Sequence, residues 1–193
     1  MYYTPLYLAY NGHMTKYTAM IRGVGPENPN MKGEKLRWAF ERLGFSQVRP
    51  FLTSGNVLFE SAETDRAKLE ALIETGLPEL LDFSRDVFVR SQAELQALVD
   101  GNPFPDLKHE NAGKTYLTVT FFKQPPKLDF ELPYRPEGKA FEFVASVDGA
   151  LCSIVDLSQG KTPDLMAWLE RQFGKQITTR TWNTVNRLLT KLG

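Results

Sequence analysis

The fold is decided by residues 141–157, which read Phe141-Glu-Phe-Val-Ala-Ser-Val-Asp-Gly-Ala-Leu-Cys-Ser-Ile-Val-Asp-Leu157. Two runs rich in aromatic and β-branched residues flank Asp148-Gly149, a dipeptide that is among the strongest short signals for a hairpin. The segment therefore predicts two antiparallel strands, Phe141–Val147 and Ala150–Leu157.

The residues before this hairpin add a strand and a loop. Lys114–Lys123 alternates two sets of side chains, which is typical of a strand with two different faces. Gln124–Ala140 contains four prolines, which exclude a long regular helix. We therefore expect a loop with at most one short turn over these residues.

The residues after the hairpin predict a helix, a short strand and a final helix. Thr162-Pro163 is an N-cap followed by a first-position proline, and the helix that it opens ends at Gly174. A brief strand is expected over Gln176–Thr179. Thr181 is the expected N-cap of the last helix, and the spacing places Trp182 on its apolar stripe, so burial of the ring is favoured over a stacking role.

The sequence of the N-terminal half predicts a similar order of elements, so the two halves of the chain share their topology in outline. Its expected elements are a strand over Lys16–Arg22, a helix from the N-cap Asn30 to Gly44, strands over Gln47–Thr53 and Val57–Glu60 around Ser54-Gly55-Asn56, a helix over Asp65–Leu81 and a strand over Phe83–Arg90. Ser91-Gln-Ala-Glu94 is a capping box that opens a further helix. We therefore predict an α+β fold of two tandem ferredoxin-like halves, each a split β-α-β unit, with antiparallel sheets and a C-terminal helix.

These patterns divide the chain into three parts. We expect the first half over residues 14–90, the second over residues 91–193 and an N-terminal extension over residues 1–13. The extension has no charged residue and contains the turn dipeptide Asn11-Gly12 just before the strand pattern begins. It is expected to be poorly ordered, and an added edge strand is the alternative.

The composition excludes several classes of protein. The chain has 193 residues, 42% of them hydrophobic, with 23 Lys and Arg against 23 Asp and Glu, which excludes a collagen, a disordered tail and a disulfide scaffold. Zero net charge argues against binding of polyanions or acidic membranes by bulk electrostatics. No apolar run reaches the roughly 20 residues that span a bilayer, and no signal peptide is evident. A soluble, cytoplasmic protein without a membrane partner is expected.

Several motifs together resemble one family. They are Arg22-Gly23, Leu43-Gly44-Phe45, Ser54-Gly55-Asn56-Val57, Arg90-Ser91-x-x-Glu94-Leu95, Asn102-Pro103-Phe104 and Thr178-Thr-Arg-x-Trp-Asn-Thr-Val185. In this order and spacing, from Met14 to Leu192, the chain resembles the bacterial domain of unknown function family 1697. The resemblance implies an α+β fold of ferredoxin-like halves and implies no activity. The first loop departs from the family, because it is richer in proline.

Polar motifs are expected to meet at one edge of the first sheet. In a split β-α-β unit the first two strands run parallel, so the end of Lys16–Arg22 should lie near the following hairpin. A helix start near Asn30 would add N–H donors for an anion, and we hypothesise that Arg22, Ser54 and Asn56 line one cleft. The alternative is that Ser54 and Asn56 only satisfy their own turn. The full candidate binding surface is Arg22, Gly23, Asn30, Ser54, Gly55, Asn56, Arg180 and Asn183.

No cofactor or metal is expected. Gly23-x-Gly25 begins like a dinucleotide fingerprint, but the third glycine is missing and prolines occupy the turn. One cysteine and two histidines are too few for a structural zinc site. Cys152 lies in an apolar strand, where a buried thiol is favoured over a nucleophile, and neither His13 nor His109 has a recognisable partner.

The expected function follows from these points. We expect a non-enzymatic binding or interaction protein, whose partner is a small anion or a protein. One alternative is an enzyme that acts, without a cofactor, on a small molecule bearing a phosphate or carboxylate. A second is nucleic-acid binding, which a basic surplus of four over residues 160–193 would support. The aromatic strand motif of RNA-binding domains with this fold is absent, which argues against that second alternative.

Overall fold

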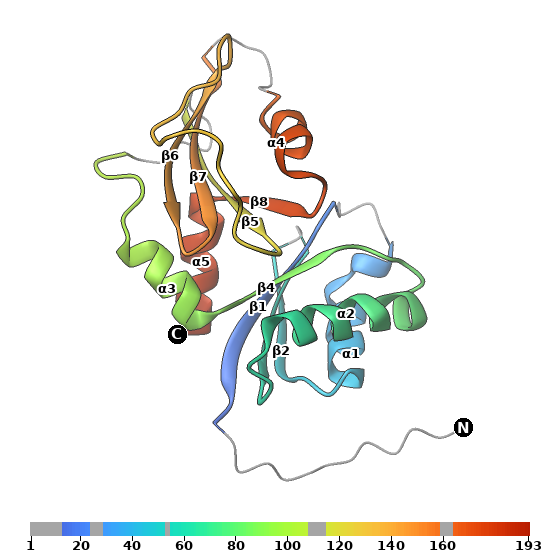
Figure 1. Cartoon of the computed structure of the whole chain (residues 1–193). Helices are drawn as coiled ribbons and strands as arrows, with labels where there is room; N and C mark the ends of the chain where they lie inside the picture. The colour runs from blue at the N-terminus through green and yellow to red at the C-terminus, as the bar shows by residue number, and fades with distance from the viewer. Residues whose placement is uncertain (1–12, 24–28, 53–54, 108–114, 159–163) are drawn as a thin grey trace. The chain divides into compact units, whose positions relative to one another are not determined.

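The computed structural model describes residues 13–23, 29–52, 55–107, 115–158 and 164–193 (Figure 1). Residues up to Gln92 fall in one compact unit and Ala93–Lys191 in a second. The expected N-terminal extension lies outside the described residues except for its last residue, as do Ser54 and the predicted cap Thr162-Pro163.

The first unit contains one four-stranded antiparallel sheet. Its elements are β1 (Thr15–Ile21), a 3-10 helix η1 (Pro29–Met31), α1 (Gly33–Arg42), β2 (Ser46–Phe51), β3 (Asn56–Ser61), α2 (Arg66–Leu81) and β4 (Val87–Ser91). The strand order is β2-β3-β1-β4, with β1 antiparallel to both β3 and β4. This is the predicted split β-α-β arrangement, and it confirms the first half of the predicted fold.

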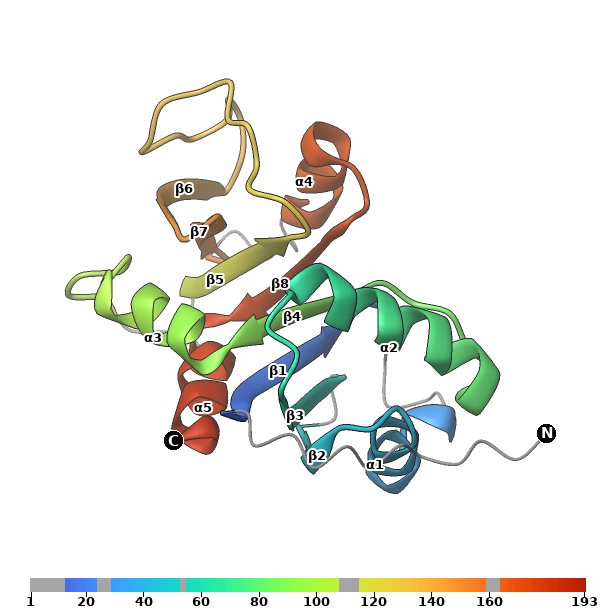
Figure 2. The ribbon, with the colours of Figure 1, turned by 60° about the horizontal axis from the view of Figure 1, so that its bottom comes forward.

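The core of the first unit lies between one face of this sheet and the helices α1 and α2 (Figure 2). Alternate residues of the strands supply the sheet side, because successive side chains of a strand point to opposite faces. Fully buried examples are Ala19, Val57 and Phe59. Phe59 stacks on Tyr17 with ring centroids 5.5 Å apart and also meets Phe40 of α1.

One predicted helix start is confirmed and another is wrong. Asp65 caps α2, since its side chain accepts hydrogen bonds from the backbone N–H groups of Ala67 and Lys68 at 2.9 and 3.2 Å. Asn30 does not cap α1, because it lies inside η1, and the extended residue at the N-cap is Lys32. The Asn30 side chain instead accepts a hydrogen bond from Lys35 Nζ at 2.7 Å.

The second unit repeats the sheet with a different connection. Its elements are α3 (Gln92–Asp100), β5 (Thr115–Phe122), β6 (Phe141–Val147), β7 (Ala150–Asp156), α4 (Leu165–Phe173), β8 (Ile177–Thr181) and α5 (Trp182–Leu192). The strand order is β6-β7-β5-β8, again with the first strand of the unit antiparallel to both neighbours. The tandem ferredoxin-like fold with a C-terminal helix is therefore confirmed.

The predicted hairpin of β6 and β7 has a two-residue turn, Asp148-Gly149. Val147 pairs with Ala150, and both loop residues have positive φ, 48° at Asp148 and 72° at Gly149. Positive φ at both positions is the signature of the turn that matches the twist of the flanking strands. The predicted cap of the last helix is confirmed as well. Thr181 caps α5, since its side chain accepts a hydrogen bond from the backbone N–H of Thr184 at 3.2 Å.

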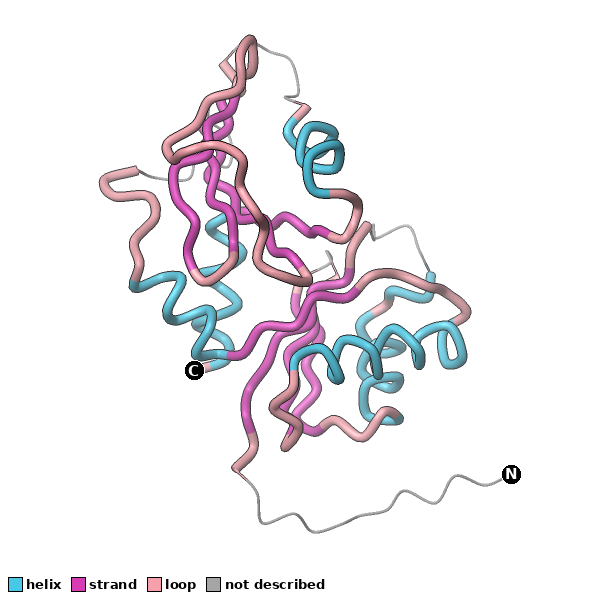
Figure 3. The backbone as a smooth tube through the Cα atoms, viewed as in Figure 1, coloured by secondary structure: helices cyan, strands magenta, loops and turns pink. Residues whose placement is uncertain are grey.

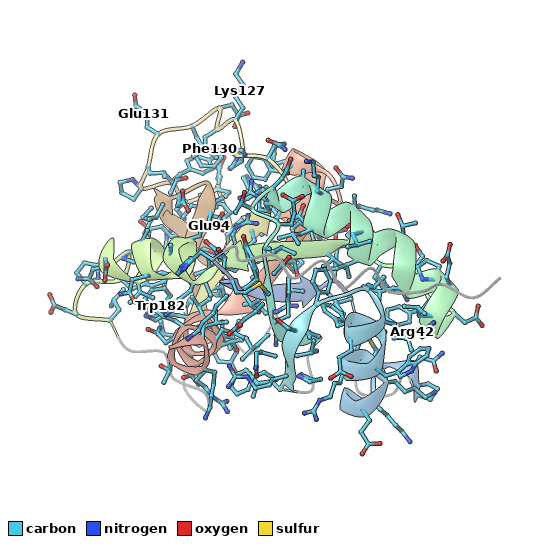
Figure 4. All side chains as sticks on the ribbon, turned by 90° about the horizontal axis from the view of Figure 1, so that it is seen from below. Arg42, Glu94, Lys127, Phe130, Glu131 and Trp182 are labelled. Atoms are coloured by element: carbon cyan, nitrogen blue, oxygen red, sulfur yellow. The ribbon has the colours of Figure 1, made fainter. Side chains whose placement is uncertain are left out.

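A loop takes the place that α1 has in the first unit. Residues 123–140 contain no helix, as predicted, and Figure 3 shows them as loop. Their partly buried apolar residues pack against the core that contains Trp168, namely Leu128, Phe130, Leu132 and Tyr134. Tyr134 also exchanges two backbone hydrogen bonds of 2.8 Å with Phe143 of β6. In Figure 4 the charged Lys127 and Glu131 point outward from this loop.

Candidate functional site

A pocket of about 540 Å³ opens in the first unit beside the end of β1. Three parts of the chain line it: the end of β1, helix α2 and the loop from α2 to β4. The lining residues are Arg22, Gly23, Glu74, Ser84, Arg85 and Asp86. Gly23 directly follows Arg22 in a turn and has a φ of +61°, a conformation that glycine adopts without strain.

Backbone pairing brings these three parts together. The N–H of Arg22 donates to the carbonyl of Asp86 at 2.9 Å, which continues the β1–β4 ladder past its last strand residues. The N–H of Val87 donates to Glu74 Oε1 at 2.7 Å, so a carboxylate of α2 is fixed beside the first residue of β4. The pocket therefore lies where the end of β1, the start of β4 and helix α2 are joined by these hydrogen bonds.

The same helix satisfies a second donor of β4. The N–H of Val89 donates to Glu70 Oε1 at 2.9 Å, and Arg90 Nη1 lies 3.8 Å from that oxygen and donates to the Val89 carbonyl at 2.7 Å. Glu70 and Arg90 are both buried. Since β4 is an edge strand of its sheet, these side chains occupy backbone groups on an edge that could otherwise pair with another strand.

The pocket carries charges of both signs. Two arginines, Arg22 and Arg85, and two acidic residues, Glu74 and Asp86, are among the residues that line it. Arg85 is exposed, and its Nη1 donates to the Ser84 carbonyl at 2.7 Å. Guanidinium groups bind carboxylates and phosphates in a bidentate manner, so the arginines suit a ligand with such a group.

The predicted cleft is found only in part. The N–H of Ile21 donates to the Gly55 carbonyl at 2.7 Å, so the hairpin does lie beside the end of β1. Asn56, however, is fully buried at the start of β3, where it pairs with Met20 and Phe51. A side chain without exposed surface cannot line an open cleft, so the hypothesis is wrong for Asn56. Of the predicted surface, the pocket includes Arg22 and Gly23.

The C-terminal candidates lie in the second unit. Arg180 is half-buried at the end of β8, and its Nη1 donates to Thr178 Oγ1 at 2.8 Å and to the Thr179 carbonyl at 2.9 Å. Burial lowers the pKa of Arg180 to about 10, so the guanidinium still keeps its charge at neutral pH. Asn183 is half-buried in the first turn of α5. Arg180 thus stabilises its own strand, as Arg90 does in the first unit.

Sequence reasoning missed four lining residues of the pocket. Glu74, Ser84, Arg85 and Asp86 carry no local motif, and pairs of surface carboxylates occur on most helices and strands. A topological signal was available, because the residues just before β4 must face the end of its antiparallel partner β1. The Arg85-Asp86 dipeptide therefore could have been placed next to Arg22.

The single cysteine is not a reactive group. Cys152 is fully buried in β7, and burial raises the pKa of its thiol to about 12, so the thiol stays protonated near neutral pH. This agrees with the predicted buried role. Within the described parts of the chain, no three His, Cys, Asp or Glu side chains are arranged to hold a metal ion.

Two of the motifs that carried the family resemblance meet in the second unit. The ring of Trp182 contacts that of Phe104 edge-on, with centroids 5.3 Å apart. Phe104 is buried, whereas Trp182 is only half-buried at the start of α5, from which Figure 4 shows it projecting. The predicted burial of the tryptophan is therefore incomplete.

The comparisons with known proteins agree with the fold. The conserved bacterial protein SP0830 from Streptococcus pneumoniae is similar in structure, with a TM-score of 0.68 and 18% identity over 94% of this chain and 100% of that chain. A comparison with curated proteins finds no match. Among the described helices, none is long and apolar enough to cross a membrane. The model of the family DUF1697, described as a protein of unknown function, matches residues 14–145, which is more than half of the chain. This chain therefore belongs to the DUF1697 family.

Proposed function

We propose that this protein is a cytoplasmic, non-enzymatic binding protein that takes a small molecule bearing a carboxylate or phosphate into the pocket beside β1. The observation that carries the proposal is the presence of Arg22 and Arg85 in one pocket of about 540 Å³. This volume lies within the range of about 300–1,000 Å³ that is common for small-molecule sites.

The pocket is held by rigid elements, which favours a preformed site. Arg22 follows a core strand, and the α2–β4 loop is fixed at both of its ends by α2 and by the bond between Arg22 and Asp86. Since less motion has to be frozen when the ligand binds, such a site loses less affinity to ordering. Arg85 is exposed and can reorient toward the ligand.

An enzyme acting on the same class of molecule is the second candidate. Glu74 and Asp86 lie in the pocket with the arginines, and a carboxylate near a bound phosphate or carboxyl ester could act as a general base. The two candidates share the ligand chemistry. They differ in whether the bound molecule is released unchanged.

The test is a titration of the 15N-labelled protein with inorganic phosphate and with acetate, followed by amide chemical shifts. We expect saturable shifts at Gly23, Ser84 and Arg85. Arg85→Ala should weaken binding by about three- to ten-fold, the loss of one partly exposed charge pair. Arg37→Ala, which removes an exposed arginine of α1 outside the pocket, is the matched control and should change nothing. Shifts confined to other surfaces would contradict the proposal.

Native mass spectrometry of the freshly purified protein separates the two candidates. A retained small molecule of constant mass supports binding without conversion. A retained molecule that changes mass on incubation with the protein supports the enzyme.

A further inference from the structure

The pocket beside β1 holds as much negative as positive charge, and this restricts its ligand. Arg22 and Arg85 line it together with Glu74 and Asp86, so the formal charges of these four residues sum to zero. A ligand that is only anionic would gain from the arginines and lose to the carboxylates, because all four lie around one small volume.

The fold fixes the carboxylate of Glu74 and the backbone of Asp86. Glu74 Oε1 accepts the hydrogen bond from Val87, so its carboxylate cannot swing away from the pocket without leaving that edge N–H unsatisfied. The backbone of Asp86 is held by the N–H of Arg22 at 2.9 Å. The two acidic residues are thus held at the site by the same hydrogen bonds that join α2, β4 and the end of β1.

We infer that the ligand is a zwitterion, a small molecule with an ammonium group and a carboxylate or phosphate. This inference rests on the proposed function and deepens it. The acidic group binds at the Arg22 and Arg85 guanidinium groups, and the ammonium group binds at the carboxylates of Asp86 and Glu74. Each ligand charge then meets its complement, whereas an acid or an amine alone meets a like charge.

The test compares probes that differ by one charge. Pentanoate, butylamine and 5-aminopentanoate have similar length, and phosphate and O-phosphoethanolamine form a second set. Amide shifts at Gly23, Ser84 and Arg85 report binding to the pocket. We expect 5-aminopentanoate or O-phosphoethanolamine to bind at least about five-fold more tightly than the matching probe without an amine, the gain of one further charge pair.

The variants make the test specific. Asp86→Asn and Glu74→Gln should weaken binding of the zwitterion and at the same time strengthen binding of pentanoate or phosphate, because a repulsive charge is removed. A distorted pocket would weaken both probes, so the opposite signs identify a charge effect. Glu79→Gln is the control, since Glu79 is an exposed residue of α2 outside the pocket and its substitution changes the net charge equally.

The outcomes separate the inference from the proposed function. If the anions bind the pocket and the zwitterions bind no more tightly, the inference is wrong and the proposed function stands. The inference is also overturned if the preference for zwitterions survives both carboxylate substitutions. If neither the anionic nor the zwitterionic probes shift the pocket amides, the proposed function fails as well.

Discussion

The edge-on contact between Trp182 and Phe104 is a measurable link between the start of α5 and the segment after α3. The centroids lie 5.3 Å apart, and aromatic pairs of this kind contribute about 0.5–1.5 kcal/mol beyond their buried area. Because Trp182 is half-buried, we expect Trp182→Ala to lower the free energy of unfolding by about 1–3 kcal/mol, less than the roughly 3–5 kcal/mol of a fully buried ring.

A double-mutant cycle with Phe104→Leu checks this prediction by urea denaturation. The expected coupling between the two positions is about 0.5–1.5 kcal/mol, while Arg187→Ala, an exposed change on the same helix, should have little effect. Additive losses in the cycle would show that the rings act independently. A Trp182→Ala loss near zero would make the tryptophan a surface residue.

Helix-capping residues could be predicted only where they directly precede a regular helical pattern. Asp65 and Thr181 precede clear helical patterns and do cap α2 and α5. Asn30 follows a proline and lies in a 3-10 turn, which gives it a helical backbone in place of the extended one that a cap requires. The sequence contains no sharp signal for that extra turn.

At the scale of elements, Gly76 lets α1 and α2 approach closely. A Cβ at Gly76 would overlap the side chain of Leu43, the residue that ends α1. An ordinary helical Gly→Ala change gains about 1 kcal/mol of helix propensity. Here we expect Gly76→Ala to destabilise the protein by about 1–2 kcal/mol in thermal or urea unfolding, because Leu43 must move within a packed interface.

The background variant Leu43→Ala decides whether the overlap is the cause. With that side chain truncated, Gly76→Ala should become neutral or stabilising, so that the sign of its effect reverses. Equal destabilisation in both backgrounds would mean that Gly76 is needed for another reason.

The strands and hairpins of the fold could be predicted from the sequence, whereas the part of the second unit's core that comes from a loop could not. The turn at Asp148-Gly149 and the alternation in β5 depend on neighbouring residues, so they can be recognised in sequence. Phe130 and Tyr134 join the core of the second unit from a proline-rich loop without any period. Only the tertiary fold brings them onto Trp168, with ring centroids 6.1 and 6.3 Å from it.

For the whole molecule, the candidate site depends on topology more than on motifs. Arg22 and Gly23 were predicted because a strand pattern ends there, but their pocket neighbours come from residues 74–86. Their approach requires the order β2-β3-β1-β4, in which β4 is the neighbour of β1. A prediction of the strand order was therefore sufficient in principle, and a search for short motifs was not.

The last prediction concerns residues 1–13 and the whole chain. The family match begins at residue 14 and β1 begins at Thr15, and among the residues that the structure describes, Tyr17 is the first that belongs to the core of the first unit. We expect deletion of residues 1–13 to leave the melting temperature within about 2 °C of the full-length value, because the matched family region and every described residue of that core are kept. A variant with residues 2–12 replaced by Gly and Ser is the control for chain length.

The alternative, an added edge strand, makes a different prediction that hydrogen exchange can detect. In the first sheet the edge strands are β2 and β4, and the outward N–H groups of Val87 and Val89 in β4 already donate to Glu74 and Glu70. An added strand would therefore pair with β2. Faster exchange of β2 amides in the truncated protein, with a loss of several degrees in melting temperature, would contradict our prediction and make the segment part of the sheet.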